Sequence, residues 1–325
     1  MHPTKVKVSF LVCVFNGASY LNRSLLSIKN QTYKNYEVII VNDASTDDSL
    51  SIIKKYSKVF PKYKVINNIN NLGLTKSLNI AAKVANGEWL ARLDADDVCH
   101  FSRLDKQLKL IFSQDSVALI GSACNFINSE SKFIFRKSFG HKSNYIKSQL
   151  YKVNAFFPHS SALIKRSIFF KVGGYDEFFQ FAQDYDLWLR ISEKYQIIAS
   201  KDFLVDIRIH NNRISSRETK KEQFIFARLA IILYWLRKKY NINPNNKLKK
   251  VLYENLISYI SESSYYKGYF YFQKIKKLFS KGEYIKSLSL IIKKLYLLLL
   301  FIIIAISTRE YFLKMDSLKI WKSNY

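Results

Sequence analysis

The sequence is poor in cysteine, and it lacks both a long uninterrupted apolar run and a recognisable secretory leader. Its three cysteines, Cys13, Cys99 and Cys124, are odd in number and far apart, which argues against a disulfide framework or a paired-cysteine metal site and fits a reducing cytoplasm. The longest apolar run, residues 295–306, has 12 residues, whereas a membrane-spanning helix needs about 20. The opening MHPTKVKVSF has no charged region followed by an apolar one, so we expect no secretion.

Acidic residues are also scarce, with 25 Asp and Glu against 52 Lys and Arg, a formal net charge of +27. The excess is greatest in residues 211–325, which contain 23 basic and 7 acidic side chains. This bias either reflects a general preference for Lys, Asn, Ile and Tyr or provides attraction to an anionic surface, namely lipid headgroups or nucleic acid.

The remaining composition predicts a folded α/β protein. Hydrophobic residues make up 48% of the 325 residues, which is enough for a packed core and excludes disorder for most of the chain. Short β-branched runs alternate with segments of helical period. We expect strands near 6–14, 37–41, 64–66 and 89–93, and helices near 48–56 and 74–84. This alternation predicts a Rossmann-like, mostly parallel sheet flanked by helices, followed by a helical C-terminal extension.

Polar turns follow all four predicted strands: FNGAS, NDASTDD, NNLGL and DADD. The carboxyl ends of parallel strands meet at one rim of a sheet, where α/β proteins bind their ligands. Any one of these turns could simply cap a helix. Four of them at the same rim favour a polar ligand.

The stretch ARLDADD concentrates three carboxylates in four positions of a strongly basic chain. Like charges this close repel one another unless a cation lies between them. An all-oxygen site of this kind suits Mg²⁺ or Mn²⁺.

Several motifs together resemble one enzyme family. The sequence contains SFLVCVFNGASYLNRSLLSIKNQTYKNYEVIIVNDASTDDS, NNLGLTKSLNIA, GEWLARLDADD, GGYDE and AQDYDLWLR in this order. This ordered set resembles the family 2 glycosyltransferases of the GT-A fold, of the bacterial surface-polysaccharide type. The resemblance covers about residues 6–216 and implies a nucleotide-sugar donor, with UDP-hexose first, and inversion at the anomeric carbon. It implies a saccharide or lipid-linked acceptor in O-antigen, capsule or lipopolysaccharide synthesis.

The resemblance also implies a domain organisation and a set of donor-binding residues. Residues 1–216 form the catalytic domain, with a nucleotide-binding half of about 1–100 and an acceptor half of about 101–216, and residues 217–325 form a basic helical region. Asp94 and Asp96 match the family's DxD, and Asp96 is the expected direct metal ligand. Asp97 is interpreted as a cap of the helix expected near 102–112. The nucleotide-contacting positions are Cys13, Asp43, Lys76, Asn79 and Asp94, although an ordinary exposed lysine is an equal alternative for Lys76.

The catalytic base is expected in AQDYDLWLR. Asp184 matches the family's catalytic Asp, while the usual preceding Glu is Gln183 here. Asp186, two residues on, is the fallback base and a candidate for the acceptor region. Trp188 is interpreted as a core residue rather than a sugar-stacking platform.

Downstream, DIRIHNNRISS resembles the family's Arg-x-His segment. It makes His210 a candidate third metal ligand and makes Arg208 and Arg213 candidate phosphate contacts. His159, in FFPHSS, lies where relatives approach the acceptor, with no specific role assigned.

Beyond residue 216 helical periodicity dominates. The run LYLLLLFIIIAI, Leu295–Ile306, is flanked by basic residues, and the segment from Tyr284 either lies in an anionic membrane interface as an amphipathic helix or packs as a buried helix. The first reading predicts an enzyme at the inner face of the cell membrane.

Two other functions remain open. A catalytically silent sugar-binding or scaffold protein of the same fold is mildly favoured by Gln183 and opposed by the intact carboxylates. A basic nucleic-acid-binding protein is suggested by charge alone, without a recognition motif.

Overall fold

The computed structural model describes residues 7–113, 116–139, 143–150, 157–210 and 219–262. By compactness the chain divides into two units, Met1–Lys249 and Lys250–Tyr325. The first unit contains the whole sheet and extends past residue 216, because it includes helix α8 (Lys220–Tyr240). The functional boundary expected at residue 216 stays a prediction.

The first half of the sheet is parallel, as the sequence predicts. Its strands lie in the order β3-β2-β1-β4, and each is paired in parallel with its neighbour. The strands and their connecting helices are β1 (Val8–Val14), α1 (Ala18–Lys29), β2 (Tyr36–Asn42), α2 (Ser49–Lys55), β3 (Tyr63–Asn67), α3 (Leu74–Val84) and β4 (Trp89–Arg92). A 3₁₀ turn, η1 (Tyr56–Lys58), follows α2.

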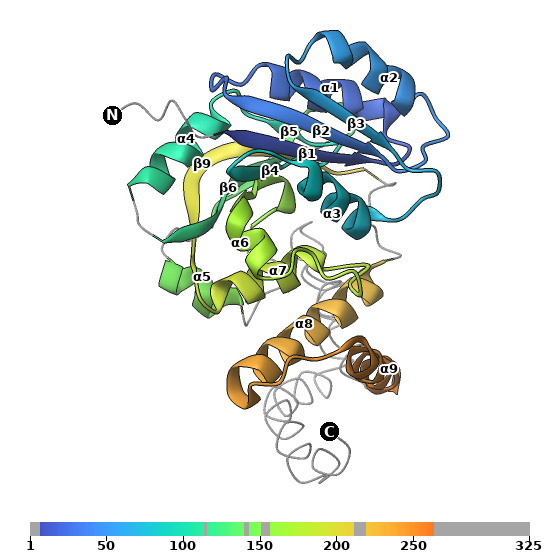
Figure 1. The fold of residues 1–325 in the computed structure, drawn as a ribbon, viewed down its shortest axis with the longest axis vertical. Helices are drawn as coiled ribbons and strands as arrows, with labels where there is room; N and C mark the ends of the chain where they lie inside the picture. The colour runs from blue at the N-terminus through green and yellow to red at the C-terminus, as the bar shows by residue number, and fades with distance from the viewer. Residues whose placement is uncertain (1–6, 114–115, 140–142, 151–156, 211–218, 263–325) are drawn as a thin grey trace, which may run out of the picture. The chain divides into compact units, whose positions relative to one another are not determined.

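Both faces of β1, β2 and β4 are buried, which is why these strands are apolar at successive positions rather than at alternate ones, whereas β3 at the edge is largely exposed. Phe10 and Val12 of β1 belong to the same core cluster as Leu21 and Leu25 of α1. Helix α3 lies on the other side of the sheet (Figure 1) and contacts β1 and β2.

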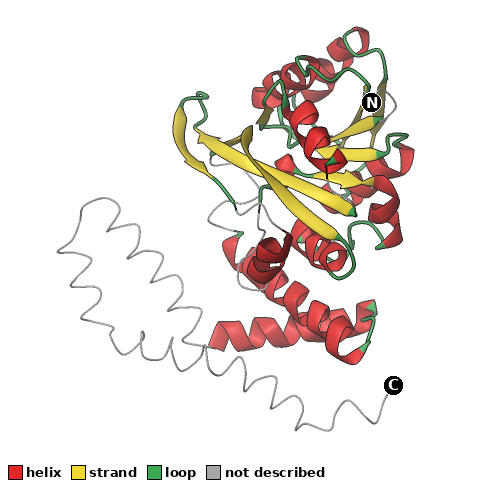
Figure 2. Cartoon of the chain, turned by 90° about the vertical axis from the view of Figure 1, so that its left-hand side faces the viewer, coloured by secondary structure: helices red, strands yellow, loops and turns green. Residues whose placement is uncertain are grey.

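The second half of the sheet is mixed rather than parallel. Strand β8 pairs antiparallel with both β4 and β6, and β6 pairs in parallel with β9. Strand β5 pairs antiparallel with β9, and β7 pairs antiparallel with β6. The predicted parallel pairing therefore holds throughout the first four strands, and among the later described strands it holds for β6 and β9. Helices flank the sheet (Figure 2). The remaining elements are β5 (Val98–Cys99), α4 (Arg103–Phe112), β6 (Val117–Ile127), β7 (Phe133–Lys137), α5 (Ser143–Leu150), η2 (His159–Ser161), β8 (Leu163–Lys165), α6 (Arg166–Lys171), α7 (Gln183–Ser192), β9 (Gln196–Arg208) and α9 (Asn246–Glu262).

None of the helices that the structure describes is long and apolar enough to cross a membrane. The segments 284–325 and 295–306 lie outside the described residues, so the interfacial and buried readings both stay predictions.

The order of the strands locates the ligand site. The chain builds β1, β2 and β3 outward in one direction and then places β4 on the other side of β1. Such a reversal opens a crevice beyond the carboxyl ends of the two central strands, β1 and β4.

Candidate active site

A cavity of about 750 Å³ occupies that crevice. It is lined by residues that follow β1, β2 and β4, by the loop before α3, by Ser129 and by the segment after β9. Its polar lining combines two carboxylates of the DADD cluster with Asp43 and His210. The lining residues are Cys13, Val14, Phe15, Asn16, Gly17, Ser19, Tyr20, Asp43, Asn71, Gly73, Leu74, Asp94, Ala95, Asp96, Ser129, Ile209 and His210.

Asp43, which directly follows β2, lines the cavity and binds the loop before α3. Its Oδ1 accepts hydrogen bonds from Asn68 Nδ2 (2.7 Å) and the Leu72 N–H (2.9 Å), and its Oδ2 accepts one from the Gly73 N–H (2.9 Å). Gly73 has φ +83°, a conformation that side-chain-bearing residues rarely adopt. Asp43 therefore shapes the cavity wall through NNLGL as well as lining the cavity itself.

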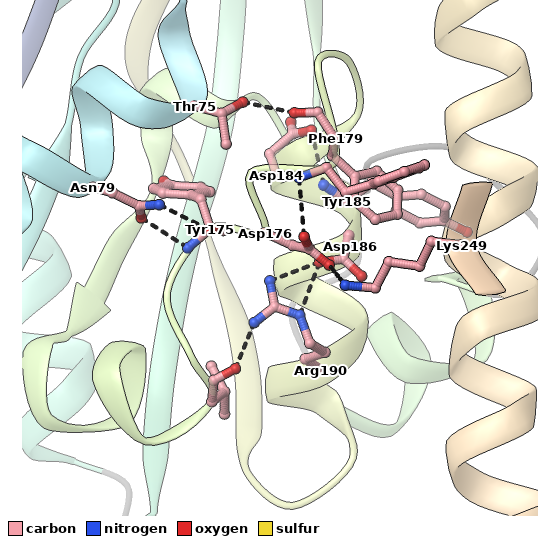
Figure 3. Close-up of polar contacts among 12 residues, drawn as sticks. Thr75, Asn79, Tyr175, Asp176, Phe179, Asp184, Tyr185, Asp186, Arg190 and Lys249 are labelled. Atoms are coloured by element: carbon pink, nitrogen blue, oxygen red, sulfur yellow. Dashed lines mark hydrogen bonds and ion pairs between the residues drawn. The ribbon is translucent and has the colours of Figure 1, made fainter. Parts of the chain in front are cut away.

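Three further residues were expected beside the nucleotide, namely Cys13, Lys76 and Asn79. Of these, only Cys13 lines the cavity. Burial raises the pKa of the Cys13 thiol to about 12, so the group is a neutral thiol. Lys76 is exposed on α3 and is absent from the cavity lining. Asn79 points elsewhere, because its amide binds the backbone N–H (3.0 Å) and carbonyl (2.8 Å) of Tyr175 (Figure 3).

Asp94 is held by a buried cation and a hydroxyl. Arg92, which is 1% exposed, donates from its guanidinium to Asp94 Oδ1, and Ser160 Oγ donates to Asp94 Oδ2 at 2.7 Å. Burial opposes ionisation of Asp94, but the Arg92 charge and these hydrogen bonds hold its pKa below the usual value. Asp94 is therefore an ionised carboxylate with its oxygens already engaged by protein groups.

Asp96 faces the cavity with a different partner. Its Oδ2 lies 2.8 Å from His210 Nε2, and the His210 ring packs on Tyr20 with 4.9 Å between ring centroids. Burial and then the charge of Asp94 raise the pKa of Asp96. A cation that enters the cavity would therefore stabilise the ionised form of Asp96.

Asp97 does not cap α4, so the sequence interpretation is wrong. The side chain is 3% exposed and turns inward, where Oδ1 accepts the Arg208 N–H at 2.8 Å and Oδ2 meets Ser160 Oγ. Burial and then the charges of Asp96 and Asp94 raise its pKa well above the usual value. Ser160 has one hydroxyl proton for two carboxyl groups, so the second hydrogen bond requires a protonated carboxyl, and Asp97 is the better candidate.

The residues at the cavity fit a divalent ion held jointly by protein and ligand. Among the described residues, no three His, Cys, Asp or Glu side chains form a metal-binding group by themselves. Asp96 and His210 offer one oxygen and one nitrogen ligand at the same wall, and Asp94 adds negative charge. Phosphate oxygens and water would supply further oxygen ligands of the kind that Mg²⁺ or Mn²⁺ prefers.

Asp184 is the second residue of α7, which follows a residue in the left-handed conformation, Ala182 with φ 55°. Its Oδ1 accepts the Tyr185 backbone N–H at 2.8 Å. Burial, and then the charge of Asp94, raise the pKa of Asp184 to about 6 in spite of that hydrogen bond. Asp184 is not among the residues that line the cavity, but it lies close enough to Asp94 and Arg92 for their charges to affect it.

Asp186 is bound to a neighbour on its own helix. It is 1% exposed, and its Oδ2 accepts hydrogen bonds from Arg190 Nε (2.8 Å) and Nη2 (2.6 Å). Arg190 also donates to the Val172 carbonyl at 2.6 Å, which ties α7 to the end of α6 (Figure 3). These contacts favour a structural role for Asp186 over the fallback base.

Arg208 supports the site from behind the cavity wall and does not line the cavity. It is 1% exposed, and its guanidinium donates to the carbonyls of Asp96 (2.9 Å) and Asn128 (2.9 Å) and to Ser131 Oγ (2.9 Å). A phosphate in the cavity could contact the Arg208 guanidinium only if this side chain moved. Arg213 lies outside the described residues, and its phosphate contact stays a prediction.

His159 is paired with Tyr175. The His159 Nε2 and Tyr175 Oη atoms are 2.7 Å apart, and burial lowers the pKa of His159 to about 3, so the ring is neutral. Trp188 packs against His159 with 5.9 Å between ring centroids and is fully buried, which confirms its interpretation as a core residue.

The sequence did not predict three further parts of the site, namely Arg92, Ser160 and Tyr20. An arginine within an apolar run, separated from DADD by Leu93 alone, is a usable signal, since an apolar strand rarely contains an unpaired cation. Ser160 and Tyr20 had no comparable signal, because each reaches the site from a distant part of the sequence.

Comparison with known proteins agrees with this architecture. The model of the family described as glycosyl transferase family 2 matches residues 9–173, more than half of the chain. The chain belongs to glycosyltransferase family 2. A relative in Haemophilus influenzae, described as an uncharacterised glycosyltransferase, is 30% identical over 285 residues, 77% of this chain and 86% of its own length.

Two more relatives extend the comparison. The O-antigen biosynthesis glycosyltransferase WbnJ of Escherichia coli is 29% identical over 208 residues, 63% of this chain and 80% of its own length. The crystal structure of Staphylococcus aureus TarS 1–349 in complex with UDP-GlcNAc matches this family 2 glycosyltransferase with a TM-score of 0.60 at 20% identity, over 79% of this chain and 73% of that one. The shared fold confirms the expected GT-A class.

Proposed function

We propose that this family 2 glycosyltransferase transfers a hexosyl group from a UDP-sugar to a saccharide or lipid-linked acceptor, with inversion and with a divalent metal. The observation that carries the proposal is the cavity beyond β1 and β4, where Asp43 lies on one side and Asp94, Asp96 and His210 lie on the other. This arrangement provides a hydrogen-bonding end for a nucleoside and a metal-binding end for a diphosphate. UDP and UDP-GlcNAc bind to TarS, which has the same fold, and this supports the choice of nucleotide.

On the donor side, each residue has a distinct part. Asp43 holds the Leu72–Gly73 backbone in place so that the loop borders the nucleoside. Asp96 and His210 would hold the metal, and a bound divalent ion neutralises the charge that develops on a diphosphate leaving group. Asp94, held by Arg92 and Ser160, keeps the first position of the DxD rigid.

On the acceptor side, Asp184 accepts the proton of the attacking hydroxyl group. Its pKa of about 6 makes it largely ionised near neutral pH while still basic enough to accept a proton. The neighbouring residue is Gln183 rather than a carboxylate, so no second acid at position 183 assists the base.

The pathway and location are proposed from relatives and charge. WbnJ acts in O-antigen biosynthesis, which supports a surface-polysaccharide acceptor here. The basic region 217–325 and its apolar run would keep the enzyme at the anionic inner face of the membrane.

A transfer assay tests the proposal. We expect the full chain to hydrolyse or transfer sugar from a UDP-hexose in a panel of nucleotide sugars, with Mn²⁺ or Mg²⁺ required and chelator abolishing turnover. Saturation-transfer NMR with the same panel would identify the bound donor. Binding without turnover of any donor would instead favour the silent scaffold, and binding of nucleic acid but of no nucleotide sugar would overturn the proposal.

A further inference from the structure

Strand β7 presents large apolar side chains to solvent. Phe133, Ile134 and Phe135 are 60%, 46% and 45% exposed, and all five residues of the strand are exposed. Within the described part of the chain, β7 pairs only with β6 and lies off the main strand order, so one of its two sides faces no described strand. Contiguous exposed apolar side chains on a folded protein usually mark a binding surface.

Basic residues accompany these apolar ones. Arg136 and Lys137 end the strand, and a bulge shifts the register of β7 against β6 between Phe126 and Ile127. Because paired residues point to the same face of a sheet, Phe135 and Lys137 share one face while Phe133 and Arg136 share the other. The Arg136 guanidinium lies 5.4 Å from the Phe203 ring centroid, and the Lys137 ammonium lies 5.1 Å from that of Phe139. Both faces of β7 therefore combine apolar groups with cations.

The hairpin that carries β7 also forms part of the active-site wall. Ser129, in the turn between β6 and β7, lines the cavity. Arg208 binds the carbonyl of Asn128 in this turn and also the carbonyl of Asp96 in the DxD segment, each at 2.9 Å. Arg23 of α1 holds Ser131 of the same turn at 2.8 Å. A partner bound along β7 would therefore lie beside the mouth of the active site.

We propose that β7 is a membrane-contact strand whose partner is an anionic phospholipid surface. Phe133, Ile134 and Phe135 would enter the headgroup and acyl boundary while Arg136 and Lys137 contact anionic headgroups. The chain's net charge of +27 favours such a surface and opposes association with a second copy. The contact presents the cavity to lipid-linked acceptors. The proposal rests on the peripheral location proposed above and adds a contact strand beside the site.

A fluorescent probe tests whether β7 itself meets the lipid. The three native cysteines are buried, although Cys13 lines the ligand cavity, so a polarity-sensitive dye is attached to Ile134→Cys in the full chain and the unsubstituted protein is labelled in parallel as a blank. We expect doxyl-labelled lipid to quench this dye in vesicles of phosphatidylcholine with phosphatidylglycerol, and not in phosphatidylcholine alone. The matched control is Phe112→Cys, which is 52% exposed at the end of α4, near the opposite end of β6.

The control and UDP binding separate the two ways in which the test can fail. If the full chain does not bind anionic vesicles, the peripheral location itself is wrong. If it binds but residues 134 and 112 are quenched equally or not at all, β7 is not the contact strand, although the location stands. UDP affinity measured on the labelled proteins reports on donor binding independently of both results.

Charge substitutions give a second measurement. Each basic residue near an anionic membrane contributes about fivefold to partitioning, so Arg136→Gln with Lys137→Gln should reduce binding by about 25-fold. Lys54→Gln with Lys55→Gln on α2 removes the same charge from exposed positions near the other edge of the sheet and should have a clearly smaller effect. Equal losses in the two pairs would overturn the proposal. So would a β7 variant that changes only the oligomeric state, because β7 would then be a self-pairing edge.

Discussion

At the residue scale, the two carboxylates of the DxD segment have separate roles although they are two positions apart. Asp94 compensates the charge of Arg92, which is 1% exposed inside the sheet. Asp96 faces the cavity, and its side chain is 27% exposed beside His210. Removal of Asp94 should therefore damage the fold, whereas removal of Asp96 should damage ligand binding.

The first prediction compares these two residues. Asp96→Ala should abolish metal-dependent donor binding, measured by calorimetry with UDP and Mn²⁺, and leave the melting temperature nearly unchanged. Asp94→Ala should lower the free energy of unfolding by about 3 kcal/mol, the low end for a broken buried pair, because the Asp94 side chain is 33% exposed. Wild-type metal dependence in Asp96→Ala would show that the metal is held elsewhere.

The second prediction concerns the base. Because the base must be ionised to accept a proton, turnover should rise about tenfold per pH unit below the Asp184 pKa of about 6 and level off above it. Asp184→Asn cannot accept the proton, so turnover should fall by about 10²- to 10⁴-fold while UDP affinity barely changes.

The comparison with Asp186→Asn is the control for that assignment. This variant should weaken the ion pair with Arg190 and lower stability rather than remove the acidic limb of the rate profile. If Asp184→Asn retained full turnover and Asp186→Asn lost it, the base would be Asp186.

At the element scale, α3 connects the nucleotide side of the site to the loop before α7. Thr75 Oγ1 donates to the Phe179 carbonyl at 2.7 Å, and Asn79 binds the backbone of Tyr175. Gly174, with φ +67°, allows this loop to turn where a Cβ would lie only 3.1 Å from Asn79 Oδ1. The helix thus positions Tyr175, the partner of His159.

The third prediction tests this connection. Asn79→Ala leaves the Tyr175 N–H and carbonyl without their partner and should cost about 1–3 kcal/mol of unfolding free energy, measured by urea denaturation. Lys76→Ala, on the exposed face of the same helix, is the control and should be neutral in stability. Its UDP affinity would also test the expected nucleotide contact of Lys76. An Asn79→Ala protein as stable as the control would show that the loop is held by other contacts.

At the scale of the whole molecule, two of the segments considered above combine basic and apolar residues. One is the region 217–325, which was expected from sequence to associate with membranes, and the other is β7 beside the cavity. Electrostatic attraction to the membrane weakens as salt is added, whereas membrane binding through inserted apolar side chains does not depend on salt.

The fourth prediction follows from this combination. The full chain should sediment with anionic vesicles, and salt should release it only in part. Truncation before Tyr284 should leave it markedly more soluble, with weaker binding through β7 and unchanged UDP affinity. Sedimentation of the full and truncated chains with vesicles, measured across a salt series, tests this prediction. If the full chain stays in the supernatant at low salt, or if truncation unfolds the catalytic unit, the segment 295–306 is an ordinary core helix.

The sequence by itself determined the strand and helix alternation of the first hundred residues, the family, and the rim where the ligand cavity lies. These features depend on local periodicity and on ordered motifs, both of which are properties of neighbouring residues. Cys13, Asp43, Asp94, Asp96 and His210 do line one cavity, as the family resemblance implied.

Only the tertiary structure decided what each polar side chain binds. Asp97 is buried against Ser160 and the backbone of Arg208, Asn79 holds Tyr175, and Arg208 supports the turn before β7. The sequence separations of these pairs range from 63 to 111 residues. A carboxylate, amide or guanidinium can take many partners, and which one it finds depends on how distant strands are placed beside each other, which no local pattern specifies.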